Sequence, residues 1–194
     1  MHHIYHTHGL VLSSINKGEA NKMLTIYTKE MGLVRAMTQG IRLNKSKLRF
    51  ALQDYSYAKV DFVRGKDIWR VTSATTVTSF PFARSSKPSI LLIARVSQLI
   101  ERLCDGEEAN PKIFDDIIQS LYLLDDTDIS ASSREALELY LILRIMNDLG
   151  YIGESEMFDK YLSSSFDHTQ TESLLKERQH IISHINKALN ESQL

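Results

Sequence analysis

The sequence predicts an α+β chain in two parts, a small β-barrel domain followed by an all-α helical domain. Up to Phe80 the chain is rich in β-branched and aromatic residues and alternates with period two, as half-buried strands do. From Pro88 onward, apolar residues recur with the period of a helix. Prolines and small polar residues separate the two patterns. We therefore expect domains at residues 1–80 and 89–194, joined by a linker at 81–88.

The first domain contains five strand-like segments, which are Ile4–Ser13, Met23–Thr28, Leu33–Gln39, Leu52–Val63 and Ile68–Ser79. No helix between them is long enough to connect parallel neighbours, which favours a small antiparallel barrel. The five-stranded OB-fold, a Greek-key barrel that binds oligonucleotides, is the main candidate, and an SH3-like barrel is the alternative. In the fourth segment, alternation separates two faces, one with Ser56, Ala58, Val60 and Phe62 and the other with Tyr55, Tyr57, Lys59 and Asp61.

The second domain contains several helices with apolar stripes. The expected helices are Pro88–Leu103, Pro111–Leu124 after an Asn110 cap, a helix from a Ser132–Glu135 capping box to Leu149, and a last helix opening at Thr169. A short helix near Glu154–Leu162 is a further expectation. Stripes of this kind indicate a helical core rather than a binding groove.

The formal net charge of −1 conceals an opposition between the two parts of the chain. Residues 1–87 carry 14 basic and 5 acidic side chains, a net of +9, whereas residues 88–194 carry 9 and 19, a net of −10. This asymmetry favours an interaction role for the basic part, and acids on the helical part would confine DNA to the barrel. A mere difference in surface composition is the alternative.

Positive charge concentrates in the third expected strand and in the segment between it and the fourth. Five cations follow one another without an intervening acid, namely Arg35, Arg42, Lys45, Lys47 and Arg49. Residues 40–49 are expected to form a loop, because glycine, asparagine and serine favour turns. A basic loop beside a β-surface suits a phosphate backbone, although a solvated charged loop is the alternative. Lys22 and Lys29 bracket the second strand and would extend the patch.

Aromatic side chains matter because single-strand binders stack bases on them. The candidates are Tyr27, Phe50, Tyr55, Tyr57 and Trp69. Tyr55 and Tyr57 share one side of their strand with Lys59, and exposure there would let them stack bases. Coverage of the barrel end or of the domain junction is the alternative. Phe62 and Phe80 are expected in the core.

Enzyme signatures are absent from the sequence. It contains no phosphate-binding glycine loop, no Gly-x-Ser-x-Gly and no His-Glu-x-x-His, so we expect a non-enzymatic protein without a cofactor. The single cysteine, Cys104, lies on an apolar helical face and is expected to be a core residue. His6 and His8 would share one face of the first strand and could bind a metal ion. His180 and His184 lie four residues apart on an expected helix, a spacing at which two histidines can bind one metal ion. We prefer to interpret all four as surface residues, and we expect no metal.

Targeting signals are also missing from the sequence. No apolar run approaches the roughly 18–20 residues that span a bilayer, and the first residues do not resemble a signal peptide. A lone cysteine fits a reducing compartment. We expect a cytoplasmic, nucleoid-associated protein with no membrane partner.

Short motifs follow one another in a fixed order along residues 9–57. Gly9–Leu12 comes first, and a Gly-Glu pair follows at Gly18. An apolar run then closes in Thr-Lys-Glu-Met-Gly at Gly32, and a strand ends at Gly40, before the basic loop and Leu-Gln-Asp-Tyr from Leu52. This ordered set resembles the RecO family of bacterial DNA repair proteins. Farther along, Leu139–Tyr151 resembles the family's helix ending in Leu-Gly-Tyr. Many members then carry a four-cysteine zinc motif, but Gly153–Phe158 follows here, so zinc is not carried over.

The resemblance implies an N-terminal OB-fold and a helical C-terminal domain. It also implies a recombination mediator that binds single- and double-stranded DNA, anneals strands, and works with RecR and single-stranded-DNA-binding protein to load RecA. The acidic tail of the latter protein would contact the helical domain, where Arg95, Arg102 and Arg144 are available cations. The alternative is a protein-interaction module in which the helical domain binds partners and the barrel is a scaffold.

Overall fold

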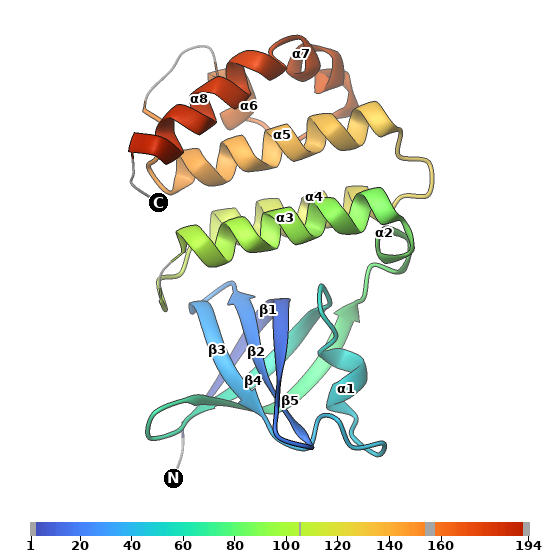
Figure 1. The fold of residues 1–194 in the computed structure, drawn as a ribbon, viewed down its shortest axis with the longest axis vertical. Helices are drawn as coiled ribbons and strands as arrows, with labels where there is room; N and C mark the ends of the chain where they lie inside the picture. The colour runs from blue at the N-terminus through green and yellow to red at the C-terminus, as the bar shows by residue number, and fades with distance from the viewer. Residues whose placement is uncertain (1–2, 105, 154–157, 192–194) are drawn as a thin grey trace.

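The computed structural model describes residues 3–104, 106–153 and 158–191 (Figure 1). A β-barrel forms one end of the molecule, and the helices lie in layers across one mouth of that barrel (Figure 1). The strands come first in the chain and the helices follow, without mixing, apart from one short helix inside the barrel region. The expected α+β arrangement is therefore confirmed.

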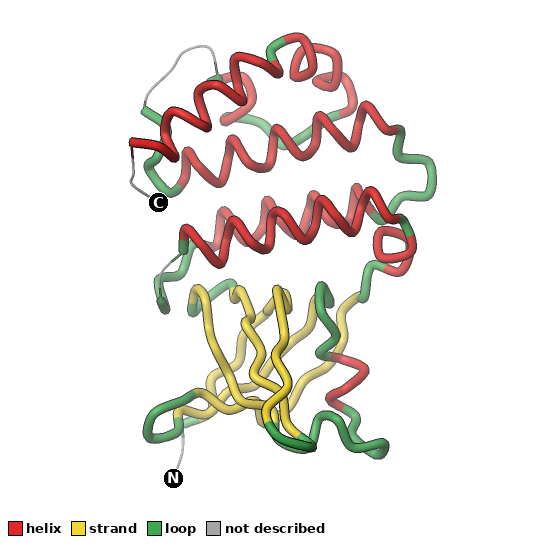
Figure 2. The backbone as a smooth tube through the Cα atoms, in the orientation of Figure 1, coloured by secondary structure: helices red, strands yellow, loops and turns green. Residues whose placement is uncertain are grey.

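Five strands close the barrel, and they are β1 (Ile4–Lys17), β2 (Asn21–Thr28), β3 (Gly32–Thr38), β4 (Tyr57–Arg64) and β5 (Trp69–Thr78). Their spatial order is β1-β2-β3-β5-β4, with β4 returning to β1. Figure 2 shows the strands gathered at one end of the molecule and the long helices at the other. All neighbours are antiparallel except β3 and β5, which run parallel where Ala36 pairs with Trp69. This closed five-stranded arrangement confirms the OB-fold rather than the SH3-like alternative.

The interior of the barrel follows the predicted alternation along β4. Ala58, Val60 and Phe62 are fully buried, and Ser56, just before the strand, is buried as well. They pack with inward residues of the other strands, such as Leu24 and Val34. Sequence alternation identified this face correctly because strand side chains point to opposite faces in turn.

The fourth strand is shorter than the sequence indicated. Residues 48–51 form a short helix, α1 (Leu48–Ala51), and β4 starts only at Tyr57. Ala51 and Leu52 are buried against the barrel core, and Ser56 Oγ donates to the Ala51 carbonyl at 2.8 Å. A helical turn folds these apolar residues inward at the barrel end, which a straight extension of β4 would not do.

The segment expected to be a linker is largely helical. Residues 81–85 form α2 (Pro81–Ser85), and α3 (Lys87–Leu103) begins two residues later. Asp125 Oδ1 accepts from the backbone N–H groups of Phe82 and Ala83, at 2.8 and 2.9 Å. Proline is tolerated in the first helical turn, so a proline-bracketed segment need not be a loop.

The remaining helices are α4 (Pro111–Leu124), α5 (Ala131–Asp148), α6 (Asp159–Leu162), α7 (Thr171–Lys176) and α8 (Arg178–Glu191). Asn110 caps α4 as predicted, accepting from Ile113 N at 3.1 Å. The cap of α5 is Ser130, two residues before the expected Ser132. The expected last helix is divided at Glu177, and residues 154–157 of the expected short helix lie outside the described residues.

The barrel and the helices share one of the two hydrophobic cores. Leu10, Leu12, Tyr27 and Leu33 point away from the barrel interior and are buried among residues of the helical part. The rings of Tyr27 and Phe114 lie 6.1 Å apart, centroid to centroid. The two parts therefore form a packed junction. Among the residues that the structure describes, no helix has the length and apolarity needed to cross a membrane.

Candidate nucleic-acid interface

The basic segment after β3 is anchored to the turn between β1 and β2. The Gly40 N–H donates to Asn21 Oδ1 at 2.9 Å, and the Arg42 N–H donates to the Ala20 carbonyl at 3.0 Å. Gly40 has a φ of +64°, a left-handed conformation that glycine adopts without strain. Ile41 is buried in the barrel end. The predicted loop is thus held in place at its start, although it carries exposed charges.

Lys45, Lys47 and Arg49 all lie exposed beyond this anchor. The Arg49 guanidinium lies 5.0 Å from the centroid of the Phe50 ring, and its Nη1 also reaches the Asn44 side chain at 3.4 Å. Phe50 is 62 % exposed. Cations and an open aromatic face therefore occur side by side on α1 and the loop before it.

A groove of about 480 Å³ gathers four cations from distant segments of the chain, which are Lys22, Arg42, Arg49 and Arg84. We call it the basic groove. Lys22 comes from β2, Arg42 and Arg49 from the basic segment, and Arg84 from α2. A single carboxylate, Asp54, also lines the groove. Sequence reasoning missed Arg84, because it lies in the segment interpreted as a linker, where no pattern links it to the other three.

The hydrogen-bond acceptors of these four cations are all neutral groups. Lys22 Nζ donates to Ser14 Oγ at 3.0 Å, and Arg42 Nη1 donates to the Gly18 carbonyl at 2.9 Å. Arg84 Nη1 donates to Gln53 Oε1 at 2.8 Å. Carbonyl, hydroxyl and amide oxygens orient a cation without cancelling its charge. The basic groove therefore keeps its positive charge available for an anionic ligand.

Lys29 lies at the opposite end of β2 from Lys22 and does not join the groove. Its Nζ lies 2.8 Å from Asp115 Oδ1 and 2.9 Å from Oδ2, a contact that ties the barrel to α4. The hydrogen bond that Lys29 donates to Asp115 raises the pKa of Lys29. Because this charge already has a partner, Lys29 is no longer a candidate phosphate ligand.

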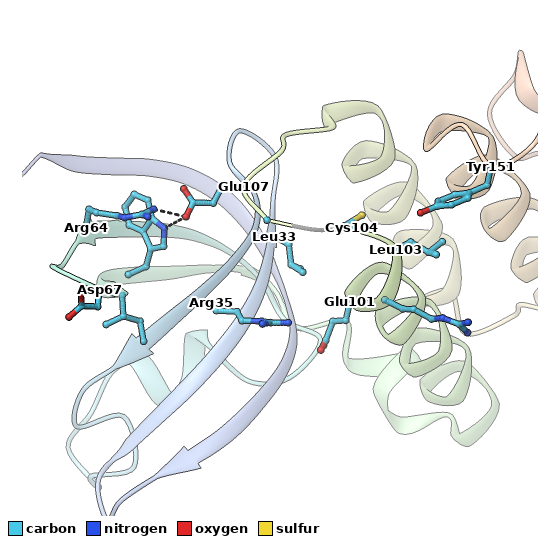
Figure 3. Close-up of a pocket in the computed structure, with 13 residues that line it drawn as sticks. Leu33, Arg35, Arg64, Asp67, Glu101, Leu103, Cys104, Glu107 and Tyr151 are labelled. Carbon is cyan, nitrogen blue, oxygen red and sulfur yellow. Dashed lines mark hydrogen bonds and ion pairs between the residues drawn. The ribbon is translucent and has the colours of Figure 1, made fainter. Parts of the chain in front are cut away.

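Arg35 also lies apart from the basic groove. It lines a second cavity, of about 510 Å³, at the junction of the barrel with α3 (Figure 3). Glu101 and Glu107 line the same cavity. Glu107 Oε1 accepts from Arg64 Nη1 at 2.5 Å and from Trp69 Nε1 at 2.7 Å (Figure 3). Cations and carboxylates are mixed here, so the cavity is less suited to a phosphate backbone.

The two tyrosines proposed for base stacking are at the domain junction. Tyr55 and Tyr57 are only partly exposed and pack against the core that the barrel shares with the helices. The Tyr57 ring lies 6.0 Å from that of Phe114, and burial raises the pKa of both tyrosines. The two tyrosines therefore cover the domain junction, which was the alternative to base stacking. Alternation showed that they leave the barrel interior but not that a second domain covers them.

Two of the other aromatic candidates are buried as well. Tyr27 is 1 % exposed and Trp69 is 6 % exposed, so neither offers a face to a base. Phe50 is the remaining candidate for stacking. Phe62 and Phe80 are fully buried, as predicted.

The four histidines considered as metal ligands do not come together at one site. His6 Nδ1 lies 2.7 Å from Asp61 Oδ1, whereas His8 packs against Tyr57. His180 is exposed, and the ring of His184 lies against Phe158. Within the described residues, no group of three or more histidine, cysteine, aspartate or glutamate side chains could hold a metal ion.

Cys104 lies half-buried at the end of α3. Burial raises the pKa of its thiol to about 11. It packs against the shared core, as expected for a small apolar residue. The thiol is therefore a poor nucleophile at neutral pH.

Two of the three helical-domain cations considered for a partner are engaged in ion pairs. Arg144 is buried and donates to Asp116 Oδ2 at 2.7 Å and to the carbonyls of Leu162 and Ser164 at 2.9 Å. Arg95 makes a two-fold contact with Glu138, at 2.5 and 2.7 Å. Arg102 lies exposed.

Comparison with known proteins places both parts of the chain in one family. The family models "Recombination protein O N terminal" and "Recombination protein O C terminal" match residues 1–80 and 89–154. "DNA repair protein RecO" of Dehalococcoides mccartyi is 31% identical over 140 residues, which cover 72% of this chain and 55% of the relative.

Two further relatives carry the same name. The protein of Pelotomaculum thermopropionicum is 32% identical over 131 residues, or 68% of this chain and 51% of the relative. The protein of Desulfitobacterium hafniense is 26% identical over 148 residues, which cover 76% of this chain and 52% of the relative. The chain spans about half the length of these curated relatives. Since the two matched models coincide with the barrel and the first helices after it, the chain belongs to the RecO family.

Proposed function

We propose that this chain is a non-enzymatic recombination mediator that binds single- and double-stranded DNA, anneals strands and assists RecA loading in DNA repair. The observation that carries the proposal is the basic groove. Four cations from three separate segments converge there, and the acceptors that hold them are neutral. Phosphate contacts dominate the affinity for DNA and require no particular base sequence. The name of the relatives, DNA repair protein RecO, agrees with this assignment.

The phosphate backbone would run along the basic groove and over the exposed cations Lys45, Lys47 and Arg49. Phe50 would stack an unpaired base, because its ring lies beside Arg49 and is open to solvent. Arg35 and Lys29 have no direct part, since they lie with carboxylates at the domain junction.

Removing the loop cations tests this proposal. The variant Lys45→Ala/Lys47→Ala/Arg49→Ala should bind DNA more weakly, and its log–log salt slope for single strands should fall by about 0.7 for each phosphate that a cation no longer neutralises. Fluorescence anisotropy with labelled oligonucleotides, at several salt concentrations, measures both quantities.

A matched control removes the same charge elsewhere. Lys176→Ala/Arg178→Ala/Lys187→Ala changes three cations of α7 and α8, on the far side of the helical part from the barrel. It should keep the salt slope of the parent protein. A loop variant that also keeps the parent slope would contradict the proposal. Annealing of complementary strands, followed by fluorescence, tests the mediator role.

The protein partners of this mediator would be RecR and the acidic tail of single-stranded-DNA-binding protein, with RecA acting indirectly. We place the protein in the cytoplasm, in association with the nucleoid. The second candidate function is a protein-interaction module with the barrel as scaffold. It is favoured by exposed apolar residues on three helices, Phe82, Leu91 and Tyr122, which are 54 %, 48 % and 51 % exposed. A protein that binds partners but no DNA at low salt would support the second function.

A further inference from the structure

The beginning of β1 extends past the end of β2 and has an unpaired edge. β1 pairs with β4 from Ile4 to Leu10, but it pairs with β2 only from Gly9 onward, where Gly9 lies opposite Thr28. Among the described residues, no strand pairs with Ile4–Thr7 on the side opposite β4. We call this stretch the open edge. Unpaired backbone groups at a strand edge can pair with another chain.

Hydrogen bonds next to the open edge show which backbone groups face it. In an antiparallel pair, the N–H and C=O of one residue point to the same side, and successive residues point to opposite sides. The His8 carbonyl accepts from the Lys29 N–H at 2.9 Å, so His8 faces the side of β2. The Val11 N–H instead donates to the segment just before β4, at 3.0 Å. Ile4 and His6 therefore direct their N–H and C=O groups to the open edge.

A groove of about 760 Å³ borders the open edge, and we call it the edge groove. Its lining includes Ile4, Tyr5 and His6 from β1 and Met31 from the β2–β3 turn. Tyr5 is 37 % exposed and lies edge-on to the ring of Trp69, with 5.0 Å between the centroids. Met31 is partly exposed. The edge groove thus combines unpaired backbone groups with apolar side chains.

The edge groove also contains a carboxylate whose charge is not cancelled. Glu30 is exposed, and it accepts from the Thr7 hydroxyl and from a backbone N–H of β1, which are neutral donors. The neighbouring cation Lys29 is paired with Asp115 instead. Glu107 also lines the edge groove, but an arginine of β4 pairs with it (Figure 3). Glu30 is therefore available to a cationic side chain.

We propose that an extended peptide segment of a partner protein binds at the open edge as an additional strand. Its backbone bonds to Ile4 and His6, in the place that β2 takes farther along β1. An apolar side chain of the peptide contacts Tyr5 and Met31, and a neighbouring lysine or arginine approaches Glu30. In this mode of recognition, main-chain hydrogen bonds supply affinity and alternate side chains supply specificity.

Nucleic acid does not fit the edge groove. Glu30 carries the same charge as a phosphate and repels it. The edge groove and the basic groove also have no lining residue in common. A partner peptide at the open edge consequently leaves the basic groove open, so one molecule can hold a protein partner and DNA together.

A second copy of this chain is a less suitable occupant. In a two-fold symmetric contact, the open edges of two copies lie antiparallel to each other. The Glu30 carboxylates of both copies then approach one interface, where like charges repel. A separate peptide with a basic residue meets no such repulsion.

Two labelled peptides that differ only in their backbone test the proposal. The first is a fluorescein-labelled hexapeptide of alternating valine and lysine. The second carries an N-methyl group on every residue, which removes the N–H donors but keeps the side chains and their charges. The parent protein should bind the methylated peptide about tenfold more weakly, as measured by fluorescence anisotropy. Equal binding of the two peptides, or no binding of the first at about 1 mM protein, overturns the proposal.

A matched pair of variants tests the edge from the side of the protein. His6→Pro and His6→Ala both lose the contact between His6 and Asp61, but only proline removes the N–H at the open edge. Because this N–H lies outside the ladder with β4, proline is tolerated there. His6→Pro should bind the unmethylated peptide about tenfold more weakly than His6→Ala. Equal affinities of the two folded variants overturn the proposal.

Thermal melting followed by circular dichroism verifies that both variants fold. Both should also bind a labelled oligonucleotide equally, because His6 lies outside the basic groove. If His6→Pro does not fold, the two peptides still decide the question on the parent protein.

A charge variant tests the basic residue of the partner. The parent should prefer the valine–lysine peptide to a valine–glutamate peptide, and Glu30→Gln should reduce this preference. Glu172→Gln, on α7, removes the same charge away from the edge groove and should keep the preference. A preference that is equal in the two variants overturns the assignment of a basic partner.

Two further outcomes would assign the open edge to another occupant. If an oligonucleotide displaces the valine–lysine peptide from the parent, the edge groove binds nucleic acid and the proposal is overturned. If light scattering finds a parent dimer that His6→Pro converts to a monomer, a second copy occupies the edge, which also overturns it.

Discussion

The basic groove and the junction between barrel and helices contain similar cations in opposite surroundings. In the groove, Lys22 and Arg42 donate to a hydroxyl and a carbonyl. At the junction, Lys29 and Arg64 contact the carboxylates of Asp115 and Glu107. The difference shows that a count of positive charge does not locate a binding surface. The charge of the partner atoms decides whether a cation joins two domains or remains available to a ligand.

The two regions should differ most in their tolerance of added side chains. A Cβ at Gly32 would lie 2.4–2.7 Å from backbone atoms of Glu108, whereas one at Gly18, in the β1–β2 turn, meets nothing within 4 Å. Both glycines have positive φ, at +68° and +62°. Gly18→Ala should therefore cost about 1 kcal/mol of unfolding free energy from backbone strain, and Gly32→Ala about 3 kcal/mol because a clash is added.

Urea unfolding of both variants measures this difference. Since the groove lies away from Gly32, folded Gly32→Ala protein should retain the DNA affinity of the parent at low salt. Equal destabilisation by the two substitutions would mean that the loop before α4 is not held against the barrel.

The reactivity of Cys104 reports how well the junction is closed. Burial raises the pKa of its thiol to about 11, from an ordinary value of about 9. At pH 8 the folded protein should therefore react with iodoacetamide about a hundredfold more slowly than the urea-unfolded chain. The rate should rise toward pH 11 rather than level off near pH 9.

The same shift has a consequence for stability. The folded state binds the thiol proton more tightly than the unfolded state, so stability should fall as pH rises from about 9 toward 11. Below about pH 8 this group should have no influence. Faster alkylation in Gly32→Ala would support a closed junction, and fast alkylation of the parent at pH 8 would contradict it.

The smallest expected effect compares the two lysines at the ends of β2, Lys22 within the strand and Lys29 directly after it. Lys22→Ala should lower the salt slope for single-stranded DNA by about 0.7, because it removes one phosphate ligand. Lys29→Ala should leave the slope unchanged, since that charge is already paired with Asp115. Anisotropy titrations at three salt concentrations resolve the two cases. A fall in slope for Lys29→Ala equal to that for Lys22→Ala would remove the distinction between groove and junction.

Much of the fold was predictable because its signals are local. The buried side of β4 followed from period-two alternation, and the apolar stripes of α3 and α4 followed from helical spacing. The Asn110 cap of α4 followed from the residue type that precedes the helix. Errors occurred where a local pattern has two solutions. Residues 52–56 were expected to open the fourth strand but lie between α1 and β4, and residues 81–85, which were expected to belong to a linker, form α2.

The candidate site was only partly predictable. The exposure of Lys45, Lys47 and Arg49 agrees with the interpretation of their segment as a charged loop. The place of Arg84 in the groove could not be predicted, because it depends on α2 packing beside Gln53, 31 residues earlier in the chain. Tyr57 is no longer a candidate for base stacking, because Phe114 of α4 packs against its ring.

Local patterns in the sequence establish the order of a basic barrel and an acidic helical domain, and which face of β4 lines the barrel interior. These properties depend on residues within a few positions of one another. Which cations keep a free charge depends on the tertiary structure. Lys22 and Lys29 lie at the two ends of β2 and cannot be distinguished by their local sequence, but Lys29 contacts Asp115, 86 residues later, when α4 packs over the barrel. Pairing of this kind depends on how distant segments pack, which no local pattern records.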